Sequence, residues 1–233
     1  MSSHKPKFTK EIYYPESDGK PMAETEFHIN VIVDLKFALR NYYRKQKDVY
    51  VSGCIMMYYV EGDPAKSISP DVFVVKGVSK EKRRTYKIWD EGQAPDVVIE
   101  ITSRKTKKED FTTKMELYAQ LGVKEYYIFN PEYPKRQPPL HAYRLAGDRY
   151  VEVLVTNNRI MSRELGLELV NTGETLRLYD PKAKEFLETD AEVYEARLNA
   201  ERIAKAEAQA RHSAEAEIVR LREELAKLKT KIK

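Results

Sequence analysis

Two carboxylates and one lysine are the residues of this chain most suited to do chemistry together. Asp71 lies in a β-branched run over residues 69–75, and Glu100 lies in a second such run over residues 95–102. Carboxylates on buried strands cost free energy unless a cation pairs with them. A helix that is expected to follow the second run carries Lys114. Two carboxylates that bind Mg²⁺, with a lysine beside them, would suit the hydrolysis of a phosphodiester.

The strand around Glu100 predicts which side of a sheet this carboxylate faces. Side chains alternate between the two faces of a strand. Glu100 is therefore expected among residues of the sheet interior, where it needs a partner. The alternative is a carboxylate near a strand end, solvated by a gap between loops. One face of the strand would carry Val97, Ile99 and Ile101, and the other Asp96, Val98, Glu100 and Thr102.

Lys114 lies within or beside the apolar stripe of its helix rather than opposite to it. The stripe is formed by Phe111, Met115 and Tyr118, which recur at helical spacing. A lysine in this place either extends outward to solvent or meets carboxylates. Asp110 lies one turn earlier, so a solvated Asp110–Lys114 pair is the simpler alternative. Two strand carboxylates and an inward lysine together favour a functional site.

Composition limits the classes of protein to consider. The 233 residues are 42% hydrophobic and 33% charged, which is enough for one globular domain with an extension. A single cysteine, Cys54, excludes an internal disulfide framework and a cysteine zinc cluster, and it fits a reducing cytoplasm. We find no secretory signal, no apolar run that could span a membrane and no glycine-rich phosphate loop. The net charge of +4 permits nucleic-acid binding without arguing for it, and the four histidines show no ligand spacing.

The sequence predicts three parts: an arm over residues 1–22, a globular domain over 23–190 and a helical tail over 191–233. The domain opens with a helix over residues 24–46, in which Glu24 suits the helix dipole at the start. The apolar stripe of this helix is Phe27, Val31, Leu35, Ala38 and Tyr42.

The middle of the domain predicts strand, helix and strand, and hence a parallel crossover. The helix is expected from near Lys107 to Gly122, which would end it, and the second strand covers residues 125–130. A hairpin is predicted over residues 140–156. The connection over residues 76–94 interleaves Lys and Arg with aromatic residues, which suits a phosphate backbone and stacked bases but equally a solvated loop.

The tail has an apolar repeat at alternating spacings of three and four residues. Such a repeat is typical of a coiled-coil seam. We therefore expect a dimerisation stalk, with a solvated and partly frayed helix as the alternative. The seam consists of Ile218, Leu221, Leu225, Leu228 and Ile232.

Several of these residues match one family pattern. The chain resembles the Uma-type restriction endonuclease family of bacteria, within the PD-(D/E)XK nuclease superfamily. The residues that carry the resemblance are Asp71, Glu100, Asp110, Lys114, Tyr118 and the stretch over 122–127. Residues 14–24 and 86–92 resemble it too, so the resemblance covers roughly residues 10–190. It implies an α/β fold, with a restriction-endonuclease-like core of a mixed sheet flanked by helices, followed here by the coiled-coil helix.

The resemblance also implies roles for individual residues. Asp71 follows Pro70 in the first motif, and Glu100 is the acidic member of the second. The superfamily lysine falls on Thr102, which departs from the pattern, and the following helix would supply Lys114 in its place. Lys105 is a less favoured substitute. Glu24 matches the position at which many relatives add a third acid.

We therefore expect a cytoplasmic, metal-dependent DNA endonuclease. Asp71 and Glu100 would bind Mg²⁺ or Mn²⁺, Lys114 would orient the attacking water or stabilise the transition state, and Asp110 would position Lys114. Glu24 would hold the metal through water. One rival is a catalytically silent DNA-binding or assembly protein on the same fold; another is a metal-dependent hydrolase of RNA or a nucleotide. A homodimer is expected, through the tail or the globular domain.

Overall fold

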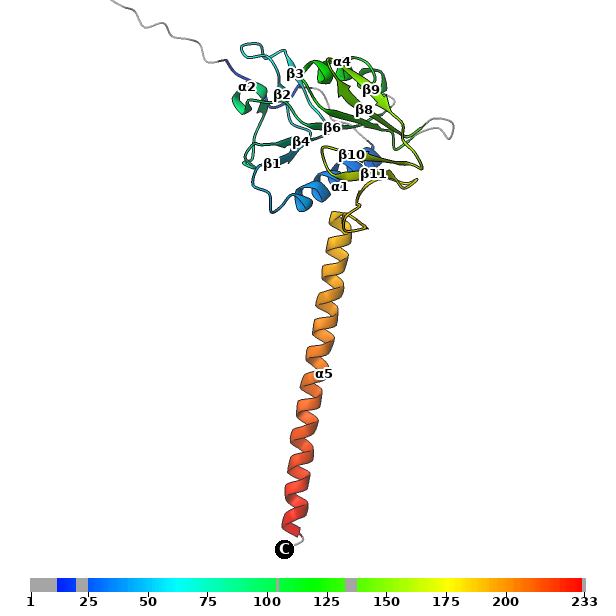
Figure 1. Ribbon diagram of the computed structural model, residues 1–233. Coiled ribbons are helices and arrows are strands. Elements are labelled where there is room, and N and C mark those ends of the chain that lie inside the picture. The colour runs from blue at the N-terminus through cyan, green and yellow to red at the C-terminus, as the bar shows by residue number, and fades with distance from the viewer. Residues whose placement is uncertain (1–11, 20–24, 104, 133–137, 232–233) are drawn as a thin grey trace, which may run out of the picture. The chain divides into compact units, whose positions relative to one another are not determined.

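The computed structural model describes residues 12–19, 25–103, 105–132 and 138–231. The chain forms two compact units, residues 1–187 and residues 188–233. The candidate site lies in the first unit, whose arrangement is shown in Figure 1.

A six-stranded mixed sheet is the centre of the first unit. Its strand order is β1-β4-β6-β7-β8-β9. Only β6 and β7 pair in parallel, and the other neighbours pair antiparallel. The parallel crossover predicted from the sequence is thus confirmed, as is the hairpin of β8 and β9. The strands are β1 (Val49–Ser52), β4 (Val72–Lys76), β6 (Val97–Ile101), β7 (Glu125–Phe129), β8 (Leu140–Ala146) and β9 (Arg149–Val153).

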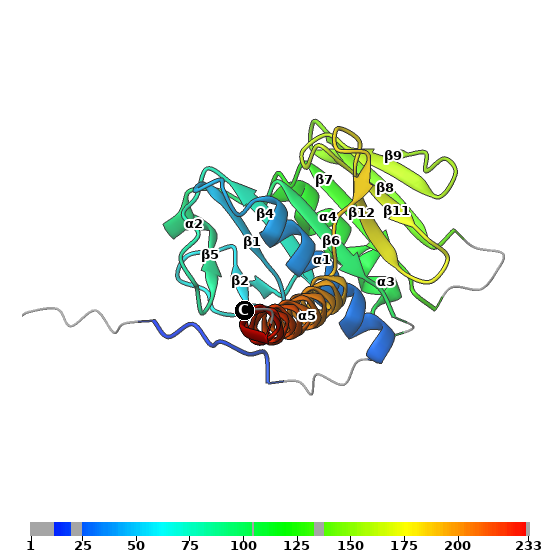
Figure 2. The same ribbon diagram turned by 90° about the horizontal axis from the view of Figure 1, so that it is seen from below.

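Helices cover both faces of this sheet. On one face, helix α1 (Glu26–Tyr42) packs against the side of β6 that carries Val97, Ile99 and Ile101. On the other face, helix α4 (Thr113–Gln120) packs with Val98. Figures 1 and 2 show α1 and α4 on opposite sides of the sheet. The alternation predicted for the Glu100 strand is therefore confirmed, and Glu100 lies on the face that α4 covers.

Two smaller sheets complete the unit. A four-stranded antiparallel sheet adds Leu167, Leu169, Leu176 and Leu178 to the core beneath α1. It contains β10 (Arg159–Ser162), β11 (Leu167–Asn171), β12 (Leu176–Asp180) and β13 (Glu185–Phe186). A three-stranded sheet contains β2 (Met57–Tyr58), β3 (Ser67–Ile68) and β5 (Tyr86–Lys87). Strand β5 and the short helix α2 (Ile88–Glu91) lie in the stretch that the sequence predicted as a polar connection.

The first helix is shorter than predicted, and its buried stripe differs from the predicted one at its first residue. Thr25 is the N-cap, and its hydroxyl accepts from the backbone N–H of His28. Val31, Leu35 and Ala38 are buried as predicted, but Phe27 is exposed and His28 is buried in its place.

The helix predicted from residue 107 consists of two pieces, α3 (Lys107–Asp110) and α4. Thr112, between them, has φ −131° and ψ −89°, outside the helical region. Its hydroxyl donates to the carbonyl of Lys108, 2.6 Å away, a bond that bends helices. Gly122 has φ +82° and follows the end of α4, as predicted.

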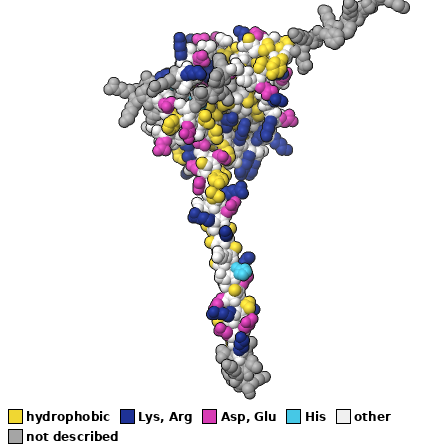
Figure 3. Space-filling view, turned by 180° about the vertical axis from the view of Figure 1, so that it is seen from behind, with side chains coloured by type: hydrophobic (Ala, Val, Ile, Leu, Met, Phe, Trp, Pro, Cys, Tyr) yellow, Lys and Arg dark blue, Asp and Glu magenta, His cyan; other side chains and the backbone are white. Residues whose placement is uncertain are grey.

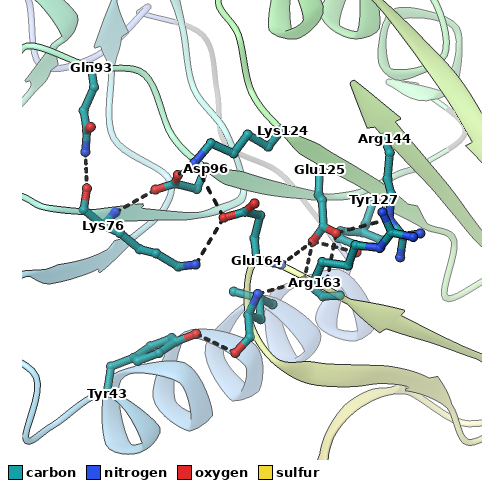
Figure 4. A network of polar contacts seen from close by, with 12 residues as sticks. Tyr43, Lys76, Gln93, Asp96, Lys124, Glu125, Tyr127, Arg144, Arg163 and Glu164 are labelled. Atoms are coloured by element: carbon teal, nitrogen blue, oxygen red, sulfur yellow. Dashed lines mark hydrogen bonds and ion pairs between the residues drawn. The ribbon is translucent and has the colours of Figure 1, made fainter. Parts of the chain in front are cut away.

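A polar network joins the start of β6 and β7 to the turn before β11. Glu125, 2% exposed, accepts hydrogen bonds from the hydroxyls of Tyr127 and Ser162, from the Arg144 side chain, and from the backbone N–H groups of residues 163 and 164. Asp96 accepts from the Lys76 N–H and the Lys124 ammonium, at 2.7 and 2.6 Å. Figure 4 shows these contacts.

The second unit is one helix, α5 (Asp190–Lys231). The long helical tail is therefore confirmed. Ile218, Leu221 and Leu225 of the predicted seam are exposed, whereas the side chain of Leu228 and residue Ile232 lie outside the described part. Among the residues that the structure describes, no helix is both long enough and apolar enough to cross a membrane.

Candidate active site

Strand pairing brings the two predicted carboxylates to one place. Strands β4 and β6 pair antiparallel, with Val72 opposite Ile99. Continuing this register by one residue sets Asp71 across from Glu100. The Oδ2 atom of Asp71 accepts a hydrogen bond of 2.8 Å from the N–H of Ile101, the residue next to Glu100. The two acids therefore meet where β4 begins and β6 ends.

Glu100 is fully buried, so the solvated alternative for this carboxylate is wrong. The hydroxyl of Tyr118 donates to its Oε1 atom at 2.6 Å, and the ammonium of Lys114 lies 3.0 Å from its Oε2 atom. Burial raises the pKa of Glu100 to about 8; Lys114 opposes this shift, whereas Asp71 and Asp110 add to it. Without a further cation, Glu100 takes up a proton near neutral pH.

Lys114 lies between two buried acids. Its Nζ atom is 2.8 Å from Oδ1 of Asp110 and 3.0 Å from Oε2 of Glu100, and 17% of its side chain is exposed. The Asp110–Lys114 pair is real, but Asp110 is only 1% exposed, so the pair is not a solvated one. Burial lowers the pKa of Lys114, but Glu100, Asp110 and Asp71 outweigh it and leave the pKa above its usual value. Lys114 is thus a cation throughout the physiological range.

Asp71 is the carboxylate of the cluster that solvent reaches, with 20% of its side chain exposed. Burial raises its pKa, but a hydrogen bond from His28, the charge of Lys114 and the Ile101 N–H together leave the pKa below its usual value. Asp71 is therefore ionised near neutral pH, whereas Glu100 is largely protonated there. Two carboxylates of one cluster are held in different states by their surroundings.

His28 is a residue of this cluster that the sequence did not indicate. Its Nε2 atom lies 3.6 Å from Oδ2 of Asp71, and it is 4% exposed. It reaches Asp71 from α1, on the opposite face of the sheet from Lys114. The one usable signal was its spacing, because His28 lies three residues before Val31 on the buried stripe; assigning Phe27 to that stripe concealed it.

The other predicted residues stand apart from these contacts. Thr102 is buried, and its N–H donates to the carbonyl of Phe129 at 2.7 Å. Lys105 is exposed in the turn before α3. In the described part of the chain, neither residue makes a hydrogen bond or ion pair with Asp71, Glu100 or Lys114. Glu24 lies outside the described residues.

The donor set suits a hard divalent cation. Oε2 of Glu100 is buried and receives no hydrogen bond from the described residues, although the ammonium of Lys114 lies 3.0 Å away. Mg²⁺ is commonly held by one or two carboxylates, with water and substrate phosphates as its other ligands. Within the described residues, no three His, Cys, Asp or Glu side chains are grouped to hold a metal by themselves. Asp71 and Glu100 could thus hold a metal that water and phosphate complete.

A family model, Uma2, described as "Putative restriction endonuclease", matches residues 9–176. No similar protein was found among the curated proteins. A solved structure that matches is that of "a putative nuclease belonging to DUF820" from Anabaena variabilis ATCC 29413. It is 15% identical, has a TM-score of 0.46, and the match covers 64% of this chain and 81% of that chain.

Proposed function

Because the chain belongs to the Uma2 family, we propose that it is a metal-dependent DNA endonuclease whose centre is Asp71, Glu100 and Lys114. The observation that supports this most is the position of Lys114. A buried lysine is held by Glu100 and Asp110 beside the partly exposed Asp71. Two acids and a fixed cation at one point are the groups that phosphodiester hydrolysis requires.

Each residue of the chain has a distinct task in this proposal. Asp71 and Glu100 would hold Mg²⁺ or Mn²⁺, and the bound ion would polarise the phosphate and lower the pKa of the attacking water. Lys114 donates hydrogen bonds to that water or to the phosphate oxygens as negative charge develops. Asp110 and Tyr118 position Lys114 and Glu100, and His28 orients Asp71.

Lys114 can also supply the positive charge that the superfamily pattern has at position 102, where this chain has a threonine. A lysine at position 102 would project from the end of β6 on the face of Glu100. Helix α4 covers this same face and brings Lys114 to 3.0 Å from Glu100. The charge is thus supplied from the helix, and Thr102 does not by itself argue against activity.

Plasmid nicking with Mg²⁺ and with Mn²⁺ tests the proposal. We expect the wild-type protein to nick supercoiled DNA with metal and to leave it intact in EDTA. Lys114→Ala should lower turnover by about 10²–10³-fold, as loss of a donor to a transition-state charge does elsewhere. The matched control is Lys108→Ala, an exposed lysine on α3. An equal loss in both variants would contradict the role of Lys114.

One observation favours a second function, a catalytically silent DNA-binding or assembly protein. It is the pairing of Lys114 with Glu100 and Asp110, because a buried cation already compensates the charge of these acids. In that case the cluster is structural and Mn²⁺ leaves the melting temperature unchanged. Comparing RNA and nucleotide substrates in the same assay separates a hydrolase of those substrates from a DNA endonuclease.

A further inference from the structure

A basic pocket lies beside the candidate active site and is not used by it. It has a volume of about 500 Å³ and is formed between α1, β1 and the segment before β5. Five of its lining residues are basic and, for the part of the chain that the structure describes, none is acidic. Figure 3 shows Lys and Arg side chains gathered on this flank of the globular unit, where Figure 1 labels α1 and β1. The basic residues are Lys36, Arg40, Lys80, Lys82 and Arg83.

The geometry of α1 connects this pocket to Asp71. His28, Ile32, Lys36 and Arg40 follow one another at four-residue spacing, and so form one row along the helix. The row begins at His28 beside Asp71 and ends in the pocket. With a rise of 1.5 Å per residue, Lys36 is about 12 Å and Arg40 about 18 Å along the axis from His28.

The pocket also shares a wall with the site. Gly53 lines the pocket, and the N–H of Cys54 donates to the carbonyl of Pro70 at 2.8 Å. A Cβ atom on Gly53 would lie only 1.9 Å from the carbonyl oxygen of Asp71, so no larger residue fits at this position without a shift. The pocket and the Asp71 carboxylate therefore lie on adjoining strands.

Not every cation of the pocket is available to a ligand. The guanidinium of Arg83 contacts both oxygens of Glu91, at 2.5 and 2.7 Å, and lies 4.2 Å from the centre of the Tyr50 ring. Its charge is thus neutralised, and its bonds to the carbonyls of Ser79 and Glu81 fix the segment that carries Lys80 and Lys82. Arg83 therefore has a structural role in the wall of the pocket that this segment forms.

The remaining cations repel one another and keep donors for an anion. Lys36 and Arg40 lie one turn apart, a spacing at which like charges destabilise a helix. Burial lowers the pKa of Lys36, Cys54 opposes that shift, and Arg40 adds to it. Each donates one hydrogen bond to a backbone carbonyl in or just after β1. Lys36 donates to the carbonyl of Gly53 at 3.2 Å, and Arg40 donates through Nε to the carbonyl of Val51 at 3.0 Å. Within the described chain, the terminal nitrogens of Arg40 and the ammonium of Lys82 make no intramolecular hydrogen bond.

We propose that this pocket binds a backbone phosphate of the nucleic acid, roughly three to five nucleotides from the phosphate that is cleaved. The inference rests on the proposed function, and it deepens it by assigning a second phosphate site. Lys36, Arg40 and Lys82 supply charge and donors, and the bound phosphate relieves the repulsion between Lys36 and Arg40. Because these residues contact only phosphate, they contribute affinity without sequence preference.

Salt-dependent DNA binding tests this site separately from cleavage. The affinity for a fluorescein-labelled duplex would be measured by anisotropy over a range of salt concentrations, with Ca²⁺ replacing Mg²⁺ and Mn²⁺. Lys36→Gln/Arg40→Gln should reduce the slope of log affinity against log salt by about two. The control is Arg149→Gln/Lys182→Gln, which removes two exposed charges elsewhere and should leave the slope unchanged.

A second variant guards against loss of the fold, because Lys36 and Arg40 also bond to the backbone near β1. Lys82→Gln breaks no hydrogen bond within the described residues and should reduce the slope by about one. Equal slopes for the wild type and both pocket variants would overturn the phosphate site, while metal-dependent nicking by the same wild-type protein would leave the proposed function standing. A wild type that binds no DNA would overturn both; titration with inorganic phosphate would then show whether the pocket binds a free anion instead.

Discussion

The two ends of strand β6 carry buried acids in opposite situations. At its start, Glu125 of the neighbouring strand accepts five hydrogen bonds, and Asp96 accepts two more from lysine residues (Figure 4). At its other end, within the described residues, Glu100 accepts one hydrogen bond, from Tyr118, and Asp110 is held by an ion pair with Lys114, 2.8 Å from its Oδ1 atom. Lys114 forms an ion pair with both of these acids.

This difference in hydrogen-bond partners leads us to assign different roles to the two ends of β6. A buried acid whose oxygens are all satisfied rigidifies the fold, as Glu125 does by joining β7 to the turn before β11. A buried acid with few donors costs free energy that a cation, a proton or a ligand must offset. We therefore propose that the Glu100 end binds a ligand, whereas the Glu125 end acts as a structural joint.

The largest expected effect is on catalysis at the Glu100 end. Asp71→Ala and Glu100→Ala should each abolish both metal binding and cleavage, because each removes a carboxylate that would hold the metal. Calorimetric titration with Mn²⁺ measures the first loss, and plasmid nicking measures the second. The control in both assays is the Glu125→Gln variant, measured at a temperature at which this variant remains folded. Retained Mn²⁺ binding in Asp71→Ala would show that the metal has other ligands.

Matched Glu→Gln variants compare the stability of the two ends. Glu125→Gln leaves donors of the network without an acceptor and should lower the free energy of unfolding by about 3 kcal/mol. Glu100→Gln should leave this free energy unchanged or raise it at pH 8, because it removes a buried charge. Urea unfolding at pH 8 gives both values. A larger loss for Glu100→Gln than for Glu125→Gln would reverse the comparison.

Binding of metal should stabilise the wild type and have no effect on a variant without the site. At a Mn²⁺ concentration of 100 times Kd, the gain is about 2.7 kcal/mol, or a rise in Tm of about 5–10 °C. Asp71→Asn should show no such rise. Thermal melting with and without Mn²⁺ measures the difference, and an equal rise in both proteins would place the ion elsewhere.

The stability of the metal-free protein should depend on pH through Glu100. Its folded pKa of about 8 lies above its unfolded value, so between about pH 5 and 8 the folded state holds a proton that the unfolded state has lost. The contribution is fully present at the acid end of this window and is lost as the pH rises through 8. Melting curves in EDTA should show Tm falling from pH 5 to 8, less steeply in Glu100→Gln. Parallel curves for the two proteins would contradict the raised pKa.

The smallest effect on folding is expected from the second unit. Deleting residues 191–233 should leave the unfolding of the first unit almost unchanged, but we propose that it lowers the mass in solution toward that of a monomer. The exposed Ile218, Leu221 and Leu225 are the reason, because a helix with this repeat buries such residues in a partner helix. Light scattering measures the mass. A monomeric full-length protein would refute the stalk, and an unchanged dimer would move the interface to the globular unit.

The sequence predicted the parts of the site that follow from local periodicity. Alternation along β6 assigned Glu100 to its face, and helical spacing paired Asp110 with Lys114. It could not predict His28, whose burial depends on where α1 crosses the sheet. The break at Thr112 was also missed, because no Gly or Pro marks it.

Long-range contacts set a further limit. Three of the five donors to Glu125 come from residues 162–164, almost 40 positions later. Nothing in the local pattern distinguishes Glu125 from Glu100, since both are acids on buried strands. The decisive difference lies in which distant donors the tertiary structure brings to each acid.

Plasmid nicking by Glu100→Ala beside the wild type is the most direct test of the claim that the Glu100 end of β6 is a metal-dependent nuclease centre. The two proteins would be compared at equal concentration with Mg²⁺, with Mn²⁺ and in EDTA. We predict nicked circles from the wild type with either metal, and none above background from Glu100→Ala or in EDTA. Cleavage by Glu100→Ala at the wild-type level, or cleavage by the wild type in EDTA, would contradict the claim.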